Sequence, residues 1–230
     1  MMKVGMLGTG IVGRTLAAKL AANGHDVVVG TRDVDALMAR TEGGLAGTPF
    51  SAWIAEQPSI RVAPFAEAAS GAEIVFNATE GSASLDALAL AGTSNLAGTI
   101  LIDTANPLDF SHGMPPTLTV ANTDSLAEQI QRAFPEAKVV KTLNTVTAML
   151  MVDPGLVAGG DHDMFVAGND ADAKASVVAL LTTEFGWRRI IDLGDLTGAR
   201  PMEMYLPLWI RMFMQFGSPL INVKVQGPGN

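Results

Sequence analysis

The 230-residue sequence contains no cysteine and only three histidines. The absence of cysteine excludes disulfide bonds, thiolate metal ligands and a cysteine nucleophile together. His25, His112 and His162 are scattered along the chain and indicate no metal site. We therefore expect no resident metal and no thiol chemistry.

Basic residues are also scarce, since 15 lysines and arginines face 23 aspartates and glutamates and give a formal net charge of -8. A nucleic-acid partner would require a broad basic surface, so we expect none. Gly5 comes too early for the apolar core of a signal peptide, and no uncharged apolar run is long enough to span a bilayer. We expect no membrane contact and a cytoplasmic location.

The composition that remains, 48% hydrophobic and 17% charged, is typical of a compact globular protein. The length suits one large α/β domain better than two small ones. The apolar residues exceed the usual share, and burial in a contact between subunits would account for the excess.

Short β-like runs alternate with helix-like segments through most of the chain. This alternation predicts a mostly parallel sheet with helices on both faces. Several of the runs are apolar throughout, as expected for strands buried on both faces. The predicted strands are Val4–Leu7, Asp26–Gly30, Ile60–Ala63, Glu73–Ala78, Thr99–Asp103, Lys138–Leu143, Asp163–Ala167 and Arg189–Leu193.

Apolar spacing of three or four residues predicts helices over 11–23, 124–134 and 170–185. Residues 41–50 and 105–119 are rich in glycine or proline and read as loops. The segment Ala199–Val223 is the most apolar region of the chain. Its methionines and aromatics favour core or subunit interface over a surface that binds a planar acceptor.

A glycine motif follows the first predicted strand directly and opens the first predicted helix: Gly8, Thr9, Gly10, Ile11, Val12 and Gly13. The spacing alone is weak, but a strand before it and a helix after it are the context of a dinucleotide-binding loop. Gly8 would make the tight turn, Gly10 would admit a pyrophosphate, and Gly13 would let helix and strand pack closely. Backbone N–H groups at the helix N-terminus would then bind the phosphates.

The second predicted strand ends in Gly30-Thr31-Arg32-Asp33, where an NAD enzyme usually carries an acid at the strand end. Arg32 offers a planar set of donors to a 2′-phosphate and Thr31 offers a hydroxyl, so NADP(H) is favoured over NAD. Asp33 could cap the next helix or accept from a ribose 2′-hydroxyl, which keeps NAD open as a cofactor.

Three polar groups follow later strands, where ligands of doubly wound folds bind. They carry amides and hydroxyls rather than strong acids or bases, which suits a carboxamide or a flat ring and hydride transfer by positioning. We therefore predict no catalytic acid or base. The candidate cofactor contacts among them are Asn77, Ala78, Thr79, Asn106 and Asn144.

These residues together resemble a known family, the NADPH-dependent reductases of the deazaflavin coenzyme F420, and the related cytosolic domains of six-transmembrane ferric reductases. Besides the glycine loop, the resemblance rests on Val28–Arg32, Asn106-Pro107-Leu108, Val139–Thr145, Asp192–Leu196 and Leu206-Pro207-Leu208. Thr79 and Asn144 stand where archaeal deazaflavin reductases tend to have proline and histidine, which is closer to the ferric-reductase branch.

The resemblance implies a Rossmann-like NADP-binding domain over 1–194 and a helical extension over 195–230 within one structural unit. It also implies a 2′-phosphate at Thr31 and Arg32, and a homodimer, with the extension at the dimer or acceptor contact. The predicted activity is hydride transfer between NADP(H) and a planar acceptor, first a deazaflavin and second a flavin.

Two alternatives stay open. A small-substrate dehydrogenase for hydroxyacids or imines commonly adds a long helical domain, often with a catalytic lysine, whereas Lys141 and Lys174 look like a strand residue and a surface residue. A non-catalytic NADP(H) redox sensor is compatible with all the motifs.

Overall fold

A computed structural model describes residues 1–227 and contains one eight-stranded sheet in the order β10-β9-β8-β5-β4-β1-β2-β3. Every neighbouring pair is parallel except β8 and β9. The strands are β1 Lys3–Leu7, β2 Asp26–Thr31, β3 Ile60–Pro64, β4 Ile74–Asn77, β5 Ile100–Asp103, β8 Lys138–Thr142, β9 Met164–Gly168 and β10 Ile190–Asp192.

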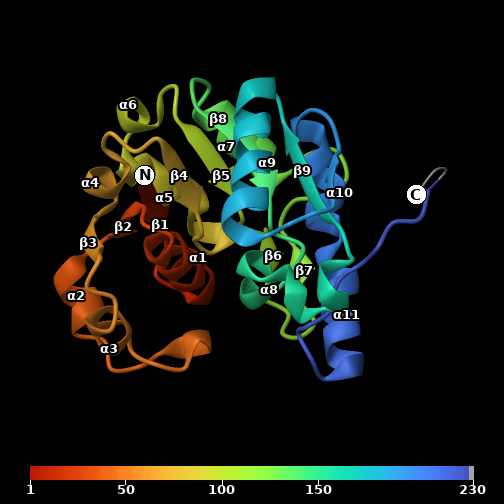
Figure 1. Ribbon diagram of the computed structural model, residues 1–230, viewed down its shortest axis with the longest axis horizontal. Helices are drawn as coiled ribbons and strands as arrows, with labels where there is room; N and C mark the ends of the chain where they lie inside the picture. The colour runs from red at the N-terminus through yellow and green to blue at the C-terminus, as the bar shows by residue number, and fades with distance from the viewer. Residues whose placement is uncertain (228–230) are drawn as a thin grey trace.

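Helices connect the strands and cover the sheet (Figure 1). Asp170 caps α9 by accepting from the N–H of Ala173 at 2.8 Å, and Gly186 ends that helix with φ 84°. The helices are α1 Ile11–Ala22, α2 Val34–Met38, α3 Phe50–Ala55, α4 Phe65–Ala69, α5 Ser84–Ala91, α6 Thr93–Leu96, α7 Leu126–Ala133, α8 Ala148–Val152, α9 Ala171–Phe185, α10 Ala199–Met204 and α11 Leu206–Phe216.

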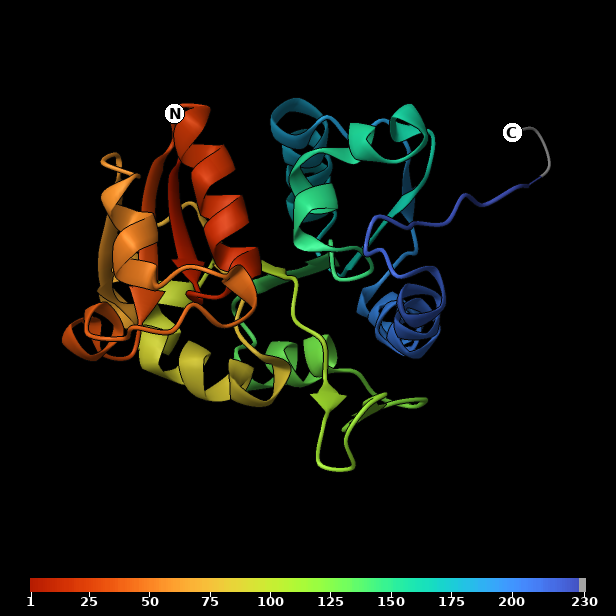
Figure 2. The ribbon, with the colours of Figure 1, turned by 90° about the horizontal axis from the view of Figure 1, so that it is seen from below.

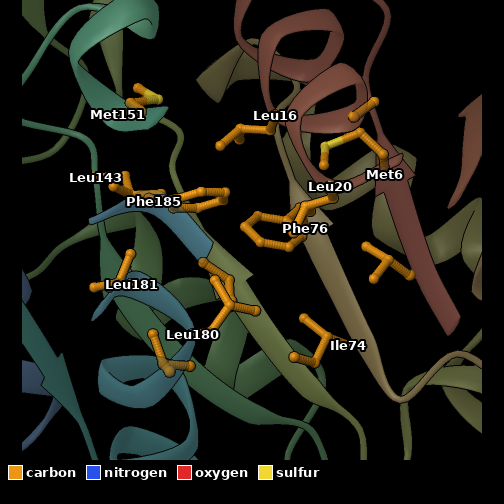
Figure 3. Packing of buried hydrophobic residues seen from close by; sticks show 14 of the residues in the cluster. Met6, Leu16, Leu20, Ile74, Phe76, Leu143, Met151, Leu180, Leu181 and Phe185 are labelled. Atoms are coloured by element: carbon orange, nitrogen blue, oxygen red, sulfur yellow. The ribbon is translucent and has the colours of Figure 1, made fainter. Parts of the chain in front are cut away.

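Alternate strand residues enter two separate cores, one on each face of the sheet. Val27 and Val29 of β2 face the core beneath α1, α8 and α9, whereas Val28 faces the core beneath α4, α5 and α7. Both faces of each central strand are therefore buried, which explains the continuous apolar runs. Figure 3 shows the first core, where Leu16 of α1 and Phe185 of α9 belong to one cluster with Met6 of β1 and Phe76 of β4.

The chain reverses its direction of travel across the sheet between β1 and β4. From β1 it moves outward to β2 and β3, and it then crosses back to add β4 and β5 on the other side of β1. The loops that follow β1 and β4 thus diverge at the carboxyl edge of the sheet. Such a switch point is where doubly wound folds bind their ligands.

The eight strands and three helices predicted from the sequence are confirmed to within two residues at each end. The predicted loop over 105–119 also contains a short hairpin that was not predicted from the sequence. Leu108–Asp109 (β6) and Thr117–Leu118 (β7) pair antiparallel, and Figure 2 shows this hairpin extending from the body. Two residues per strand are too few to give a recognisable period in a segment rich in proline and glycine.

The apolar tail forms α10 and α11, with Pro207 in the first turn of α11. Leu206 and Ile210 are buried, but Leu208, Met214 and Phe216 lie exposed on the same helix. Within residues 1–227 no helix has both the length and the apolar character that crossing a membrane requires.

Candidate functional site

Only glycine fits at two positions of the motif that joins β1 to α1, one in the turn and one in the first turn of the helix. Gly8 has φ 126°, and a Cβ there would lie 2.3 Å from the carbonyl oxygen of Ala78. A Cβ on Gly13 would lie 2.2 Å from the carbonyl oxygen of Gly8. Gly10, by contrast, has open space where its Cβ would stand. The turn therefore packs tightly against β4 on one side and leaves the backbone at Gly10 bare for a ligand.

Two cavities meet at this bare backbone. One cavity, of about 490 Å³, runs toward the end of β2 and the start of α5 and is lined by Gly10, Thr31 and Arg32. The other, of about 760 Å³, runs toward β5 and the hairpin and is lined by Gly10, Asn106 and Phe110. We name them the β2 cavity and the β5 cavity. Both are also lined by Thr9, Arg40, Ala78, Thr79 and Glu80.

The residues that follow β2 place one cation and one carboxylate at the β2 cavity. Arg32 lines the β2 cavity, and within residues 1–227 it forms no ion pair. Asp33 also lines this cavity, but its side chain accepts from the N–H of Ala36 at 2.9 Å and caps α2. Of the two roles open to Asp33, helix capping is the one that the structure shows.

A second arginine stands in the same place. Arg40, just beyond α2, is exposed and lines both cavities. It too forms no ion pair in the part of the chain described. Sequence reasoning missed it, because eight residues of turn and short helix separate it from the strand end. Two free guanidinium groups beside one cavity suit a phosphate group.

Asn77, at the end of β4, is fully buried and its amide is already bonded on every side. Nδ2 donates to Oδ1 of Asp103 at 2.8 Å and to Oγ of Ser84 at 3.0 Å, and Oδ1 accepts from the hydroxyl of Thr79 at 2.6 Å. The Thr79 hydroxyl hydrogen is therefore turned toward Asn77. Thr79 offers its remaining lone pair as an acceptor in the cavities that it lines.

Asn106 and Asn144 form a reciprocal pair across the ends of β5 and β8. Asn106 Nδ2 donates to the backbone oxygen of Asn144 at 2.9 Å, and Asn144 Nδ2 donates to Oδ1 of Asn106 at 2.9 Å. Asn144 Nδ2 also donates to the backbone oxygen of Met202 in α10 at 3.1 Å. Asn106 reaches the β5 cavity, whereas Asn144 is buried behind it.

Behind these asparagines lies a fully buried ion cluster. Nζ of Lys141 is 2.8 Å from Oδ2 of Asp103 and 2.8 Å from Oε1 of Glu203, and it also donates to the carbonyl of Ala105. Burial alone would lower the pKa of Lys141, but the two carboxylates outweigh burial and raise the pKa above its ordinary value. The lysine is therefore charged and is not a free base.

Glu203 joins this cluster to the start of a neighbouring helix. Its carboxylate accepts from the backbone N–H of Leu126 at 2.8 Å and of Ala127 at 3.2 Å. These N–H groups open α7 and would otherwise lack partners. One carboxylate from α10 thus satisfies both the buried lysine and a helix N-terminus.

The structure brings most of the predicted site residues together at the two cavities. Gly8, Thr9, Gly10, Thr31, Arg32, Ala78 and Thr79 line the β2 cavity, and Ile11, Val12 and Asn106 line the β5 cavity. Gly13, Asn77 and Asn144 line neither and can act only by holding residues that do. Arg14, Arg40 and Phe110 were missed, since none stands in a motif.

A doubly wound sheet with a glycine turn at its switch point and an arginine-lined cavity beside it is the arrangement of a dinucleotide-dependent oxidoreductase. The sequence pattern of a family described as NADP oxidoreductase, coenzyme F420-dependent, matches residues 3–107. A solved structure from Arthrobacter sp. FB24, described as a candidate F420-dependent NADP-reductase, is 59% identical, with a TM-score of 0.95 over 99% of this chain and 100% of that one. The chain belongs to the F420-dependent NADP oxidoreductase family.

Two curated relatives extend this assignment. The metalloreductase STEAP3 of Rattus norvegicus is 32% identical over 90% of this chain, which spans only 38% of the rat protein. The F420-dependent NADP reductase of Methanothermobacter marburgensis is 29% identical over 92% of both chains. The resemblance drawn from the sequence motifs is confirmed, including the relation to part of a metalloreductase.

Proposed function

We propose that this protein transfers hydride between NADP(H) and a planar acceptor, with a deazaflavin coenzyme as the first candidate and a flavin as the second. The observation that carries the proposal is the meeting of two cavities at the bare backbone of Gly10. The β2 cavity has a polar lining that includes Arg32 and Arg40 together with Asp33, Glu80 and Asp86, whereas the β5 cavity, which Arg40 also reaches, is lined mostly by apolar groups. A dinucleotide with one phosphorylated end and one redox ring needs this pair of environments.

The phosphorylated end of the cofactor fits the β2 cavity. Arg32 and the hydroxyl of Thr31 would hold the 2′-phosphate, and the backbone N–H groups from Gly10 to Val12 would hold the pyrophosphate at the start of α1. The bare backbone at Gly10 and the tight packing at Gly8 and Gly13 support this placement. A carboxylate acceptor for a free ribose 2′-hydroxyl is missing at the strand end itself, which favours NADP over NAD.

The nicotinamide and the acceptor would share the β5 cavity. Ile11, Val12 and Phe110 give it apolar walls, and Asn106 supplies an amide at its inner end. Apolar walls with a few fixed polar groups are typical of sites for flat ligands. Nicotinamide, when bound, supplies the hydride, and the chain's own task is to hold the donor and acceptor carbons close together and away from water.

The acceptor is identified by following the loss of NADPH absorbance with coenzyme F420, FMN, FAD or a ferric chelate in turn. We expect the fastest turnover with the deazaflavin, because the family and the archaeal relative are both described by that coenzyme. Fastest turnover with the ferric chelate would instead favour the chemistry named for the rat relative. Tight NADPH binding without turnover of any acceptor would contradict the enzyme and support a redox sensor.

The small-substrate dehydrogenase fits less well. Lys141 could have served as its proton donor, but the side chain is fully buried between Asp103 and Glu203. Only Lys174 among the two lysines considered lies near the surface, and its Nζ pairs with Asp192 at 2.9 Å, away from both cavities. Reduction of an imine or of a 2-oxoacid by NADPH would revive this alternative.

We also propose that the protein is a homodimer and that residues 195–230 form one structural unit with 1–194. The exposed apolar side chains of α11, Leu208, Met214 and Phe216, support a contact between subunits. The bonds from Glu203 to Lys141 and to α7 support the single unit. Residues 228–230 of the predicted extension lie outside the described residues. Light scattering should give twice the monomer mass, and Phe216→Ser should reduce it.

A further inference from the structure

Arg14, in the first turn of α1, connects the phosphate loop to a distant segment of the chain. Its Nε donates to the carbonyl oxygen of Thr9 at 2.9 Å, and its Nη1 donates to the carbonyl oxygen of Thr48 at 2.7 Å. Arg14 is only 8% exposed. The guanidinium is therefore fixed at both ends and is not a mobile surface charge.

No carboxylate within residues 1–227 balances this charge. Arg14 forms no ion pair there; its guanidinium carbon lies 5.2 Å from the ring centre of Phe50 and 5.8 Å from that of Trp53. Burial lowers the pKa of Arg14, which reflects the cost of removing a cation from water. Folds keep such a cost mainly where a site needs the group.

The bond to Thr9 sets the direction of the peptide that follows it. In a planar trans peptide the C=O and the next N–H point in opposite directions. Because the Thr9 carbonyl points at Arg14, the N–H of Gly10 points away from Arg14. Gly10 lines both cavities and has open space beside its Cα. Arg14 thus fixes the orientation of the amide at the point where a pyrophosphate would approach.

The bond to Thr48 secures the wall of the β5 cavity. Residues 43–46 line that cavity together with Arg14, and Thr48 stands two residues after Ala46. Before α3 begins at Phe50, the segment 41–50 holds one short 3-10 turn, Gly44–Ala46, so few hydrogen bonds of its own fix its path. One guanidinium therefore holds the floor of the phosphate site and the wall of the acceptor site.

We propose that Arg14 is a positioning residue for the pyrophosphate of the dinucleotide, which orients the Thr9–Gly10 peptide and couples it to the segment 41–50. This inference rests on the proposed function, because it assumes that a dinucleotide binds at Gly10. It differs from the role proposed for Arg32: the pyrophosphate is common to NADP and NAD, so Arg14 serves both cofactors equally.

The test compares dissociation constants for NADPH and NADH, from ligand fluorescence, in the wild type and in Arg14→Met, Arg14→Lys and Lys19→Met. Methionine keeps packing against the two rings but donates no hydrogen bond, and lysine keeps the charge but cannot bond both carbonyls at once. Lys19 lies on the same helix and lines neither cavity, so Lys19→Met controls for lost charge. We expect Arg14→Met to weaken both cofactors by about tenfold. Arg14→Lys should lose less, and Lys19→Met should match the wild type.

Hydrogen–deuterium exchange of the backbone amides around Thr48, which Arg14 holds, tests the coupling. NADPH at saturating concentration should slow this exchange in the wild type but not in Arg14→Met. Unchanged dissociation constants with only a lower melting temperature, a loss confined to NADPH, or full protection of Arg14→Met would each overturn the proposal. If Arg14→Met does not fold, the same comparisons with Arg14→Lys decide. A wild type that binds neither cofactor would instead refute the proposed function.

Discussion

The two ends of the candidate site are built in opposite ways. At the end of β2 the functional groups are close in sequence, and the arginines stand free: Arg32 and Arg40 have no ion pair among the residues described. At the ends of β5 and β8 the amides of Asn106 and Asn144 are bonded to each other, and the buried Lys141 cluster lies behind them. The arginines at the end of β2 therefore contribute little to the stability of the fold, whereas the polar groups at the ends of β5 and β8 help to hold it together.

This difference separates recognition from stability. A substitution at the end of β2 should change which cofactor binds and leave the free energy of unfolding almost unaltered. A substitution in the buried cluster should change the free energy of unfolding first and catalysis only as a consequence. Three measurements follow from this contrast.

The largest effect is expected for Lys141→Met. Removing the ammonium leaves the buried carboxylates of Asp103 and Glu203 without the cation that they share. Breaking a buried pair in this way costs roughly 3–5 kcal/mol of unfolding free energy. Urea unfolding followed by circular dichroism measures it. The control is Lys174→Met, whose partner Asp192 is 55% exposed, so its cost should stay below about 1 kcal/mol.

If Lys141→Met lowers the unfolding free energy no more than Lys174→Met does, the buried cluster contributes no more to stability than a surface ion pair. The contrast between the two ends of the site would then be wrong.

Arg32→Ala should act on binding alone. Losing charged donors to a 2′-phosphate corresponds to about 1.5–3 kcal/mol, or a roughly 10- to 100-fold weaker affinity for NADP. Affinity for NAD should not change, and unfolding free energy should move by less than about 0.5 kcal/mol. Titration calorimetry with both cofactors measures the ratio. Arg61→Ala, which removes an exposed arginine paired with Asp26, is the matched control. Equal losses for NADP and NAD would remove the 2′-phosphate role.

The smallest effect concerns pH. The folded-state pKa of Lys141 lies above its ordinary value of 10.5, so the lysine's contribution to stability is complete below that value. It is lost only as the pH rises through the higher, folded-state pKa. The difference in unfolding free energy between wild type and Lys141→Met should therefore be the same at about pH 7 and about pH 9. A difference that shrinks across this range would mean that the pKa of Lys141 is lowered in the folded protein.

The phosphate loop and the pair Thr31-Arg32 could be predicted because their residues are contiguous, whereas Arg40, further along the chain, was missed. The roles of Gly8 and Gly13 can be predicted from the strand that precedes them and the helix that follows. Alternation of apolar runs with helical periods was sufficient for the sheet and for its position relative to the loop. The antiparallel direction of β9 relative to β8 could not be predicted, because a strand buried on both faces has the same apolar pattern in either direction.

The other end could not be predicted in the same way. Asp103 and Lys141 meet across two neighbouring strands although 38 residues separate them, and Glu203 arrives from a helix still further along. No spacing rule connects such residues. For the same reason the sequence showed that Asn77 follows a strand but not that its amide is fully occupied. Whether the residues proposed here contact NADP stays a prediction until binding is measured.

Glu203 limits how the chain can be truncated and which part of it can be transplanted into another protein. A chain shortened to residues 1–194 would retain the glycine turn, both arginines and every strand of the sheet. It would nonetheless lose the second carboxylate on Lys141 and the acceptor for the first N–H groups of α7. An engineer who wishes to transplant only the nucleotide-binding part must therefore redesign Lys141 together with the start of α7, because the extension completes the interior of the part that it follows.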